Sequence, residues 1–417
     1  MSPNEPRLSA HKIVYQCLSG PAGLQEALDQ ELQNICDQRD KALITEIVYG
    51  YLRFRGRIDF VINLFLDEPD KLPSGLKILM GLAGYELFFL DRVPDYATVS
   101  RAVDLSSRMY GRKMSGLVNA VLRKVVYVDI TSENTFKKDS PDDTLFWSRF
   151  YSCPQWIVKM WKKTYGKELC LAYLRQSLDK PPLGIRENKG SLGIISSENI
   201  AIRLDNSVLI KKSYPELEKH LLEGRISRQS FAGQQAMFEL GMKDWKEPVW
   251  DMCAGSGGKS FLMLDLGMDV YSSDLSLKRL INLKKSANIY RDTARVFAAS
   301  GYFPPLKSIP ATIVIDAPCT GFGVLSRRPD IKWKRRPGDI DRLARTQAEL
   351  LKGAASLSGE QDRIVYLTCT LCRDENERRI NDFLYEHKEY SLEKKFQTDP
   401  LLELKEFFFG AVLRKGY

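Results

Sequence analysis

From Pro248 onward, short apolar runs alternate with longer stretches of helical periodicity, and this alternation constrains the fold more than any other feature. The apolar runs are Val249-Trp250, Val270-Tyr271, Thr312–Asp316 and Arg363–Leu367. Buried strands separated by helices predict a parallel, doubly wound sheet, because a helix normally connects two parallel strands. Ligands of such sheets bind beyond the carboxyl ends of the strands. We therefore expect the functional residues in the loops that follow these runs.

The preceding part of the chain has a different pattern. Apolar residues recur at intervals of three and four, as at Ile44, Val48 and Leu52, which predicts an all-helical domain over residues 1–130. A polar stretch, Thr131 to Asp143, then breaks the periodicity and is typical of a linker. We predict a linker and a small α+β connecting region over 131–230, and a Rossmann-like α/β domain over 231–417.

The chain has 417 residues and a formal net charge of +9, and most of the basic excess lies beyond residue 150. Such an excess attracts polyanions such as RNA, although it also serves simply to keep a surface soluble. No apolar stretch reaches the roughly 18 residues of a spanning helix, and the N-terminus has no signal pattern. We expect a soluble, cytoplasmic protein with no membrane partner.

The eight cysteines are scattered, which favours a reducing compartment over a disulfide framework. The three histidines are not spaced with cysteines as in a structural zinc site, so we expect no metal.

A glycine-dense turn follows the first strand of the α/β region. It includes Gly255, Gly257 and Gly258, and glycine allows a ligand to approach the backbone closely. A phosphate loop would need glycine where Cys253 stands, and a dinucleotide fingerprint would need glycine or alanine at Ser260. The turn instead suits the methionine part of an adenosyl ligand, and the acid Asp274 ends the next strand, where it can bind ribose hydroxyls. An ordinary strand-ending turn with an exposed aspartate is the alternative.

Two further strands end close to cysteines, Cys319 after Asp316-Ala-Pro and Cys369 after Thr368. C5 of a pyrimidine is a poor nucleophile until a thiolate adds at C6, so a cysteine solves the central problem of C5 methylation. Asp316 can protonate or hydrogen-bond N3 as charge develops, and a second cysteine can assist product release. The residues alone do not rank Cys319 against Cys369.

Other interpretations of these residues remain open. A free cysteine is often a small buried hydrophobe, and Cys369 with Cys372 could form a redox pair. The run from Ser326 to Arg336 places basic residues around a tryptophan, which suits phosphates and unstacked bases but also occurs as a solvated charge run.

Together these motifs resemble the Sun/RsmB branch of the RNA cytosine-C5 methyltransferases. The resemblance is carried by five segments: Asp251–Lys259, Asp316–Gly323, Arg327–Trp333, Thr368–Thr370 and Glu375–Glu377. In the helical part, Glu46–Asp59, Leu90–Pro94 and Val118–Lys124 are similar to the NusB-like RNA-binding domain of that branch.

The resemblance implies a class I methyltransferase that uses S-adenosyl-L-methionine and acts on small-subunit (16S) ribosomal RNA, and we expect a monomer. It implies that Cys369 is the nucleophile and that Cys319 acts in release, with Asp316 and Lys259 as further catalytic candidates. The expected cofactor-binding residues are Cys253, Ala254, Gly255, Ser256, Gly257, Gly258, Lys259, Asp274, Ser300 and Asp316. The expected RNA-binding residues are Arg327, Arg328, Lys332, Trp333 and Lys334.

The sequence departs from the family pattern at two places. Gly255-Ser256 replaces Ala-Pro, and Ser300 replaces an aspartate that contacts the adenine amine, which predicts weaker cofactor binding. A catalytically weak or silent RNA-binding assembly factor on the same fold is therefore the alternative function. A DNA cytosine-C5 methyltransferase is disfavoured, because those enzymes attack with the Pro-Cys cysteine and do not need Cys369.

Overall fold

The computed structural model describes residues 5–137, 140, 142–290, 294–302, 306 and 310–416. The chain forms two compact units. The helical unit ends at Asp179 and also contains Arg328–Lys334, and the remaining residues from Lys180 onward form the α/β unit. A short piece of the C-terminal half of the sequence thus belongs to the helical unit.

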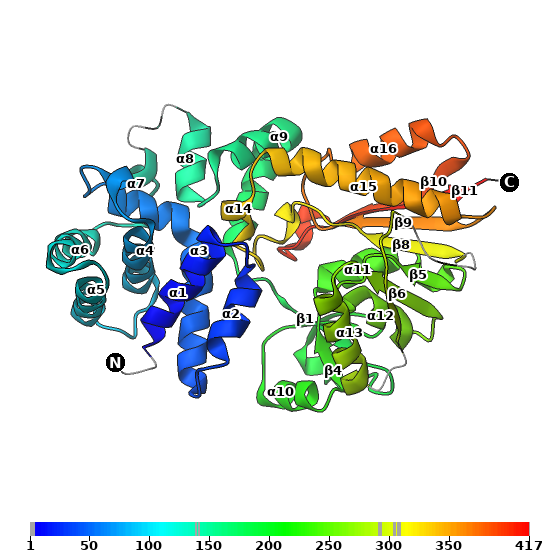
Figure 1. Ribbon diagram of the computed structural model, residues 1–417, viewed down its shortest axis with the longest axis horizontal. Helices are drawn as coiled ribbons and strands as arrows, with labels where there is room; N and C mark the ends of the chain where they lie inside the picture. The colour runs from blue at the N-terminus through cyan, green and yellow to red at the C-terminus, as the bar shows by residue number, and fades with distance from the viewer. Residues whose placement is uncertain are drawn as a thin grey trace. The chain divides into compact units, whose positions relative to one another are not determined.

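The helical unit consists of helices (Figure 1) that bury apolar side chains between them. Its elements are α1 (Pro6–Ser19), α2 (Leu24–Leu32), α3 (Gln38–Asn63), η1 (Pro69–Lys71), α4 (Ser74–Phe89), α5 (Asp95–Tyr110), α6 (Arg112–Val125), α7 (Glu133–Lys137), α8 (Asp143–Phe150), α9 (Gln155–Leu178) and α14 (Ile331–Lys334). The long helix α3 buries Ile44, Val48 and Leu52, as their spacing predicts.

The helical unit extends further along the chain than its expected end near residue 130. The ring centroid of Phe60 in α3 lies 5.3 Å from that of Phe136 in α7, which in turn lies 5.5 Å from that of Phe150 in α8. Arg57 lies 4.2 Å from the Phe150 ring and donates to the carbonyl of the same residue at 2.7 Å. These contacts bind α7 and α8 to α3. Residues 138, 139 and 141 of the expected linker lie outside the described residues.

The α/β unit begins with a small antiparallel sheet of order β2-β3-β1-β4. Its elements are β1 (Leu183–Glu187), η2 (Ser197–Asn199), β2 (Ile200–Leu204), β3 (Ser207–Ile210), α10 (Pro215–Leu222), β4 (Ile226–Arg228), α11 (Phe231–Glu239) and η3 (Met242–Asp244). Ile185, Val208 and Ile226 form its core. The four strands of this sheet lie within residues 131–230, the range for which we predict a linker and a small α+β connecting region.

A seven-stranded sheet of order β10-β11-β9-β8-β5-β6-β7 forms the rest of the unit. Its strands are β5 (Val249–Asp251), β6 (Val270–Asp274), β7 (Arg295–Ala298), β8 (Thr312–Asp316), β9 (Arg363–Thr368), β10 (Tyr390–Gln397) and β11 (Phe409–Lys415). Strands β5 to β9 are parallel, and β11 pairs antiparallel with both β9 and β10. The helical elements are α12 (Gly258–Asp265), α13 (Leu277–Tyr290), η4 (Phe322–Val324), α15 (Gly338–Leu357), α16 (Glu377–Glu386) and η5 (Pro400–Leu402).

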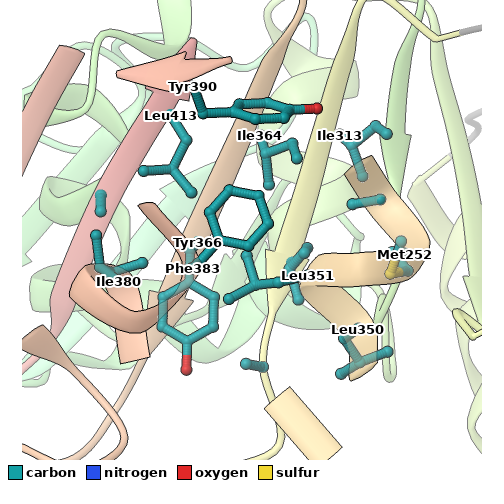
Figure 2. Close-up of a cluster of buried hydrophobic side chains, with 14 of the residues drawn as sticks. Met252, Ile313, Leu350, Leu351, Ile364, Tyr366, Ile380, Phe383, Tyr390 and Leu413 are labelled. Atoms are coloured by element: carbon teal, nitrogen blue, oxygen red, sulfur yellow. The ribbon is translucent and has the colours of Figure 1, made fainter. Parts of the chain in front are cut away.

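Helices cover both faces of the large sheet (Figure 1), and the central strands β5 and β9 are accordingly buried along nearly their whole length. Figure 2 shows the core on one face, where Tyr366 and Ile364 of β9 pack among Leu351 of α15 and Phe383 of α16. On the other face, Phe261 of α12 contacts the α13 residues around Leu283. The predicted doubly wound α/β fold is confirmed, as are the four strands expected from the apolar runs.

Candidate active site

The chain order of the sheet reverses at β5, which has β6 on one side and β8 on the other. At such a switch point the loops diverge and leave a crevice beyond the carboxyl ends of the strands. A pocket of about 370 Å³ lies there, lined by Met252, Cys253, Asp274, Leu275, Ser276, Arg279, Ala299, Gly301, Tyr302, Asp316, Pro318, Thr346 and Leu350. Small-molecule sites are typically concave and mostly apolar with a few polar groups, as this pocket is.

The glycine turn between β5 and α12 adopts backbone angles that favour glycine. Gly255 has φ +57° and Gly257 has φ +92°. A side chain on Gly257 would come within 2.6 Å of Phe261 and 2.8 Å of Leu283, whereas one on Gly255 would meet nothing within 4 Å. The turn is therefore packed tightly at Gly257 and open at Gly255.

Asp274 fixes this turn from the end of β6. Its carboxylate accepts hydrogen bonds from the backbone N–H of Gly255 at 3.0 Å and of Ser276 at 2.8 Å, and it borders the pocket. Apolar walls from Met252, Leu275 and Leu350 can enclose an adenine ring, while the carboxylate can accept from ribose hydroxyls. The residues present thus fit an adenosyl cofactor.

Asp251 and Cys253 are the buried polar residues at the start of the turn. Ser260 donates to Asp251 at 2.6 Å, and the other carboxylate oxygen has no hydrogen-bond partner within the described part of the chain. Burial raises the pKa of Asp251 to about 7, although the Ser260 hydrogen bond opposes the shift. Burial also raises the pKa of the Cys253 thiol, so that cysteine is neutral near pH 7.

Lys259, in the first turn of α12, forms an ion pair of 2.5 Å with Asp316 at the end of β8. Burial alone would lower the pKa of Lys259, but the Asp316 carboxylate and the more distant Cys369 and Asp251 outweigh it and raise that pKa. The ammonium group is therefore a fixed positive charge at neutral pH. It lies between the glycine turn and the cysteine loops.

The two cysteines that the sequence singles out lie together. The Sγ atoms of Cys319 and Cys369 are 3.4 Å apart, and each thiol is partly buried. The hydrogen bond to Cys369 raises the pKa of the Cys319 thiol well above its usual value, and burial adds to this. Cys319 thus keeps its proton and can donate it to the Cys369 sulfur. Cys372 is buried elsewhere, with a pKa of about 12 caused by burial.

A buried hydrogen-bond network of Thr320, Thr370 and Glu375, which the sequence did not predict, lies behind the thiols. Thr320 and Thr370 each follow a cysteine directly, and their hydroxyl oxygens are 2.6 Å apart next to the carboxylate of Glu375. The repeated Cys-Thr dipeptide was the available signal. Glu375 was noted only as part of a motif, because sequence spacing cannot show that its side chain turns back toward both loops.

Several predicted cofactor residues lie around the pocket without lining it. Cys253, Asp274 and Asp316 border it, whereas Ala254, Gly255, Ser256, Gly257, Gly258 and Lys259 are not among its lining residues. The hydroxyl of Ser300 accepts from the backbone N–H of Tyr302 at 3.2 Å, and its neighbours Ala299 and Gly301 line the pocket. The assignment of these residues to the cofactor stays a prediction.

The basic run after β8 is held by protein contacts. The Lys332 ammonium is 1% exposed and donates to the Arg53 carbonyl at 2.8 Å, and the Trp333 indole donates to the Leu52 carbonyl at 2.6 Å. Lys334 donates to the Ala22 carbonyl at 2.5 Å. These three residues belong to the helical unit. With its ammonium bonded to a backbone carbonyl, Lys332 is poorly placed to reach a phosphate, and the RNA-binding role expected of Lys332, Trp333 and Lys334 stays a prediction.

The two arginines of the run are more accessible. Arg327 pairs with Glu406 through two hydrogen bonds of 2.6 and 3.0 Å, and Arg328 lies 3.4 Å from Asp330. Both side chains remain about two-fifths exposed, at 39% and 42%. An RNA-binding role for either arginine stays a prediction.

Among the described residues, no helix combines the length and apolar character needed to cross a membrane. Within the same residues, no group of three or more histidine, cysteine or acidic side chains is arranged to hold a metal ion.

Relatives of known type match both parts of the chain. Residues 239–406 match the family model of the 16S rRNA methyltransferase RsmB/F, and residues 4–127 match the NusB family. A probable ribosomal RNA small subunit methyltransferase B of Bacillus subtilis (strain 168) is 28% identical over 90% of this chain and 90% of its own length. The ribosomal RNA small subunit methyltransferase B of Proteus mirabilis (strain HI4320) is 28% identical over 98% of both chains.

Solved structures show the same fold. The crystal structure of PH0851 has a TM-score of 0.76 at 22% identity and covers 99% of each chain. A methyltransferase homologue from Pyrococcus horikoshii has a TM-score of 0.55 at 20% identity, over 66% of this chain and 99% of that one. With its helical NusB-type region and its Rossmann-like sheet, the chain is similar to ribosomal RNA small subunit methyltransferases, and its residues 239–406 match the model of the 16S rRNA methyltransferases RsmB/F.

Proposed function

We propose that this chain transfers a methyl group from S-adenosyl-L-methionine to C5 of a cytosine in small-subunit ribosomal RNA, through a covalent adduct with Cys369. The observation that carries the proposal is the 3.4 Å separation of Cys319 and Cys369 beside the Lys259–Asp316 ion pair. A single reactive cysteine would serve many reactions, but two thiols in contact match a reaction that both forms and breaks a carbon–sulfur bond.

The surroundings of the thiols support different roles for them. Cys369 attacks C6 as a thiolate, which forms the S–C6 bond and moves electron density onto C5 and N3. The raised pKa of the Cys319 thiol favours its protonated form, and the Lys259 ammonium adds positive charge near the thiols. A protonated Cys319 can donate a hydrogen bond to the Cys369 sulfur, which suits Cys369 as the attacking group. This supports the order that the family resemblance implies.

Asp316 lines the pocket and forms the ion pair with Lys259. Cytosine N3 carries no proton, so Asp316 in its protonated form can donate one to N3 as that nitrogen gains electron density. When bound by Asp274 and the glycine turn, S-adenosyl-L-methionine supplies the methyl group. A base, either water or the Asp316 carboxylate, then takes the C5 proton, and the S–C6 electron pair returns to Cys369. The Cys319 thiol, 3.4 Å away, can assist this elimination by donating a hydrogen bond to the departing sulfur.

Trapping with 5-fluorocytosine tests the proposal, because fluorine at C5 cannot leave as a proton does and the adduct persists. With cofactor and 5-fluorocytosine-substituted ribosomal RNA, we expect the intact enzyme to form a denaturation-resistant adduct and Cys369→Ala to form none. With ordinary RNA, Cys319→Ala should accumulate adduct, whereas Cys372→Ala, the matched control, should behave as the unmodified enzyme. Adduct formation by Cys369→Ala would refute the assignment.

A further inference from the structure

The loops that carry the two cysteines are joined by one buried carboxylate. The Thr320 backbone N–H donates to Glu375 Oε1 at 2.8 Å, and the Thr320 hydroxyl donates to Oε2 at 2.5 Å. The Thr370 hydroxyl lies 2.6 Å from the Thr320 hydroxyl and 3.4 Å from the same Oε2. Each threonine directly follows a cysteine, so these bonds fix the loops within one residue of both thiols.

Glu375 is itself held rigidly. It is completely buried, and Gln347 donates to its Oε1 at 3.0 Å and to the Pro318 carbonyl at 2.9 Å. The Tyr366 hydroxyl donates to the Glu375 backbone carbonyl at 2.7 Å. A buried carboxylate costs stability unless it is well hydrogen-bonded, so this network has a single favourable arrangement.

Neighbouring residues fix the outer sides of the two loops. Asn376 donates to the Thr370 carbonyl at 2.9 Å and accepts from the Thr368 hydroxyl at 2.5 Å. Its side chain thus holds the residues on either side of Cys369. Arg335 donates to the carbonyls of Cys319 and Thr320, each at 3.1 Å. Neither loop can shift without breaking bonds to the other or to these residues.

We propose that Glu375 is a positioning residue that holds the Cys319 and Cys369 loops at the thiol separation needed for adduct release. The inference rests on the proposed function. Glu375 does not line the pocket, and its carboxylate accepts from Thr320 and lies 3.4 Å from the Thr370 hydroxyl, so it acts through the two threonines. Displacing a reacting group by about 1 Å can cost on the order of a hundredfold in rate, which gives such a positioning role a measurable size.

Thiol separation can be measured without any methylation. In a glutathione redox buffer, oxidised glutathione accepts the two electrons as Cys319 and Cys369 lose their protons and form a disulfide. Its equilibrium fraction, quantified by peptide mass spectrometry, reports how closely the thiols are held. We expect Glu375→Ala to lower the effective concentration of the pair by about tenfold or more.

Two variants serve as comparisons. Glu375→Gln keeps the shape and can reverse the hydrogen-bond direction through the threonine hydroxyls, so we expect it to stay within about threefold of the unmodified enzyme. Glu377→Gln changes a carboxylate of the same Glu-Asn-Glu motif that pairs with Lys395, 3.7 Å away, and should leave the disulfide equilibrium unchanged. If Glu375→Ala does not fold, Thr370→Val removes one hydroxyl from the network and is expected to weaken the pair in the same direction.

The adduct assay completes the test. Glu375→Ala should form the 5-fluorocytosine adduct but release product from ordinary RNA about a hundredfold more slowly, with the KM for RNA changed less than threefold. Unchanged disulfide equilibrium and unchanged release in both Glu375→Ala and Thr370→Val would overturn the inference. If Glu375→Ala changes the disulfide equilibrium but the unmodified enzyme forms no adduct, the proposed function alone is refuted.

Discussion

At the scale of single residues, burial and charge separate side chains that the sequence presents as equals. Cys319 and Cys369 both follow strands of one sheet, and the hydrogen bond to Cys369 together with burial raises the pKa of the Cys319 thiol well above its usual value. Asp251 and Asp274 both end strands, yet Asp251 is fully buried and Asp274 borders the pocket. Local sequence does not encode these differences, because they depend on what packs around each group.

The buried Asp251 predicts a pH effect on stability. Its folded pKa of about 7 exceeds the unfolded value of about 3.9, so within this window the folded state holds a proton that the unfolded state lacks. The free energy of unfolding should therefore fall as pH rises toward 7, by up to about 1.4 kcal/mol per pH unit from this group, and then level off.

Urea denaturation of the unmodified chain and of Asp251→Asn at pH 5, 6, 7 and 8 measures this contribution. Asparagine cannot ionise, so the difference between the two proteins should favour the unmodified chain at pH 5 and shrink toward pH 7. Parallel stability curves for the two proteins would show that Asp251 does not titrate in this range.

At the scale of secondary-structure elements, the fold followed from the sequence where the local signal was strong. The apolar runs became β5, β6, β8 and β9, and the glycine turn leads into α12 as expected. Beyond the predicted helical domain of residues 1–130, α7 and α8 are held to α3 by aromatic contacts between residues far apart in the sequence. Periodicity within a helix does not reveal such partners.

The N-terminal end of α12 depends on the glycine at position 257. Gly257→Ala places a methyl group against Phe261 and Leu283 at a positive φ, so we expect a loss of about 2–4 kcal/mol in stability and weaker cofactor binding. Gly267→Ala is the matched control, since Gly267 has φ +83° but open space around it, and should cost only about 1–2 kcal/mol.

Thermal denaturation and calorimetric titration with S-adenosyl-L-methionine check both variants. Equal losses of stability in Gly257→Ala and Gly267→Ala would mean that backbone strain, and not packing against Phe261, determines the requirement for glycine.

At the scale of the whole molecule, a segment of the second half of the chain completes the first unit. Residues Arg328–Lys334 leave the α/β unit shortly after Cys319, join the helical unit, and return at Arg335, which bonds the Cys319 loop. The sequence shows this run as basic and aromatic, features that favour RNA binding. The tertiary structure uses Lys332 and Trp333 instead to satisfy backbone carbonyls of α3.

The burial of Lys332 leads us to expect that it contributes little to RNA binding. Lys332→Met should leave the slope of log binding constant against log salt concentration unchanged, because a buried ammonium releases no counterion from RNA. It should also leave stability unchanged or raise it, since burial lowers the pKa of Lys332 to about 7 and its charge is costly in the folded state.

Filter-binding measurements across salt concentrations with ribosomal RNA check the slope, and Arg336→Met, which changes an exposed residue of the same run, is the comparison. A decrease of about one in the slope for Lys332→Met would show that Lys332 contacts a phosphate after all.

The sequence by itself determined the class of fold, the strands that open onto the site and the residue types that suit C5 methylation, because periodicity and motif spacing are local properties. Only the tertiary structure brought Cys319 and Cys369 to 3.4 Å, placed Glu375 behind them and buried Lys332. Separation, burial and hydrogen-bond partners depend on residues distant in the chain, and these same quantities set the charge and position of each reactive group.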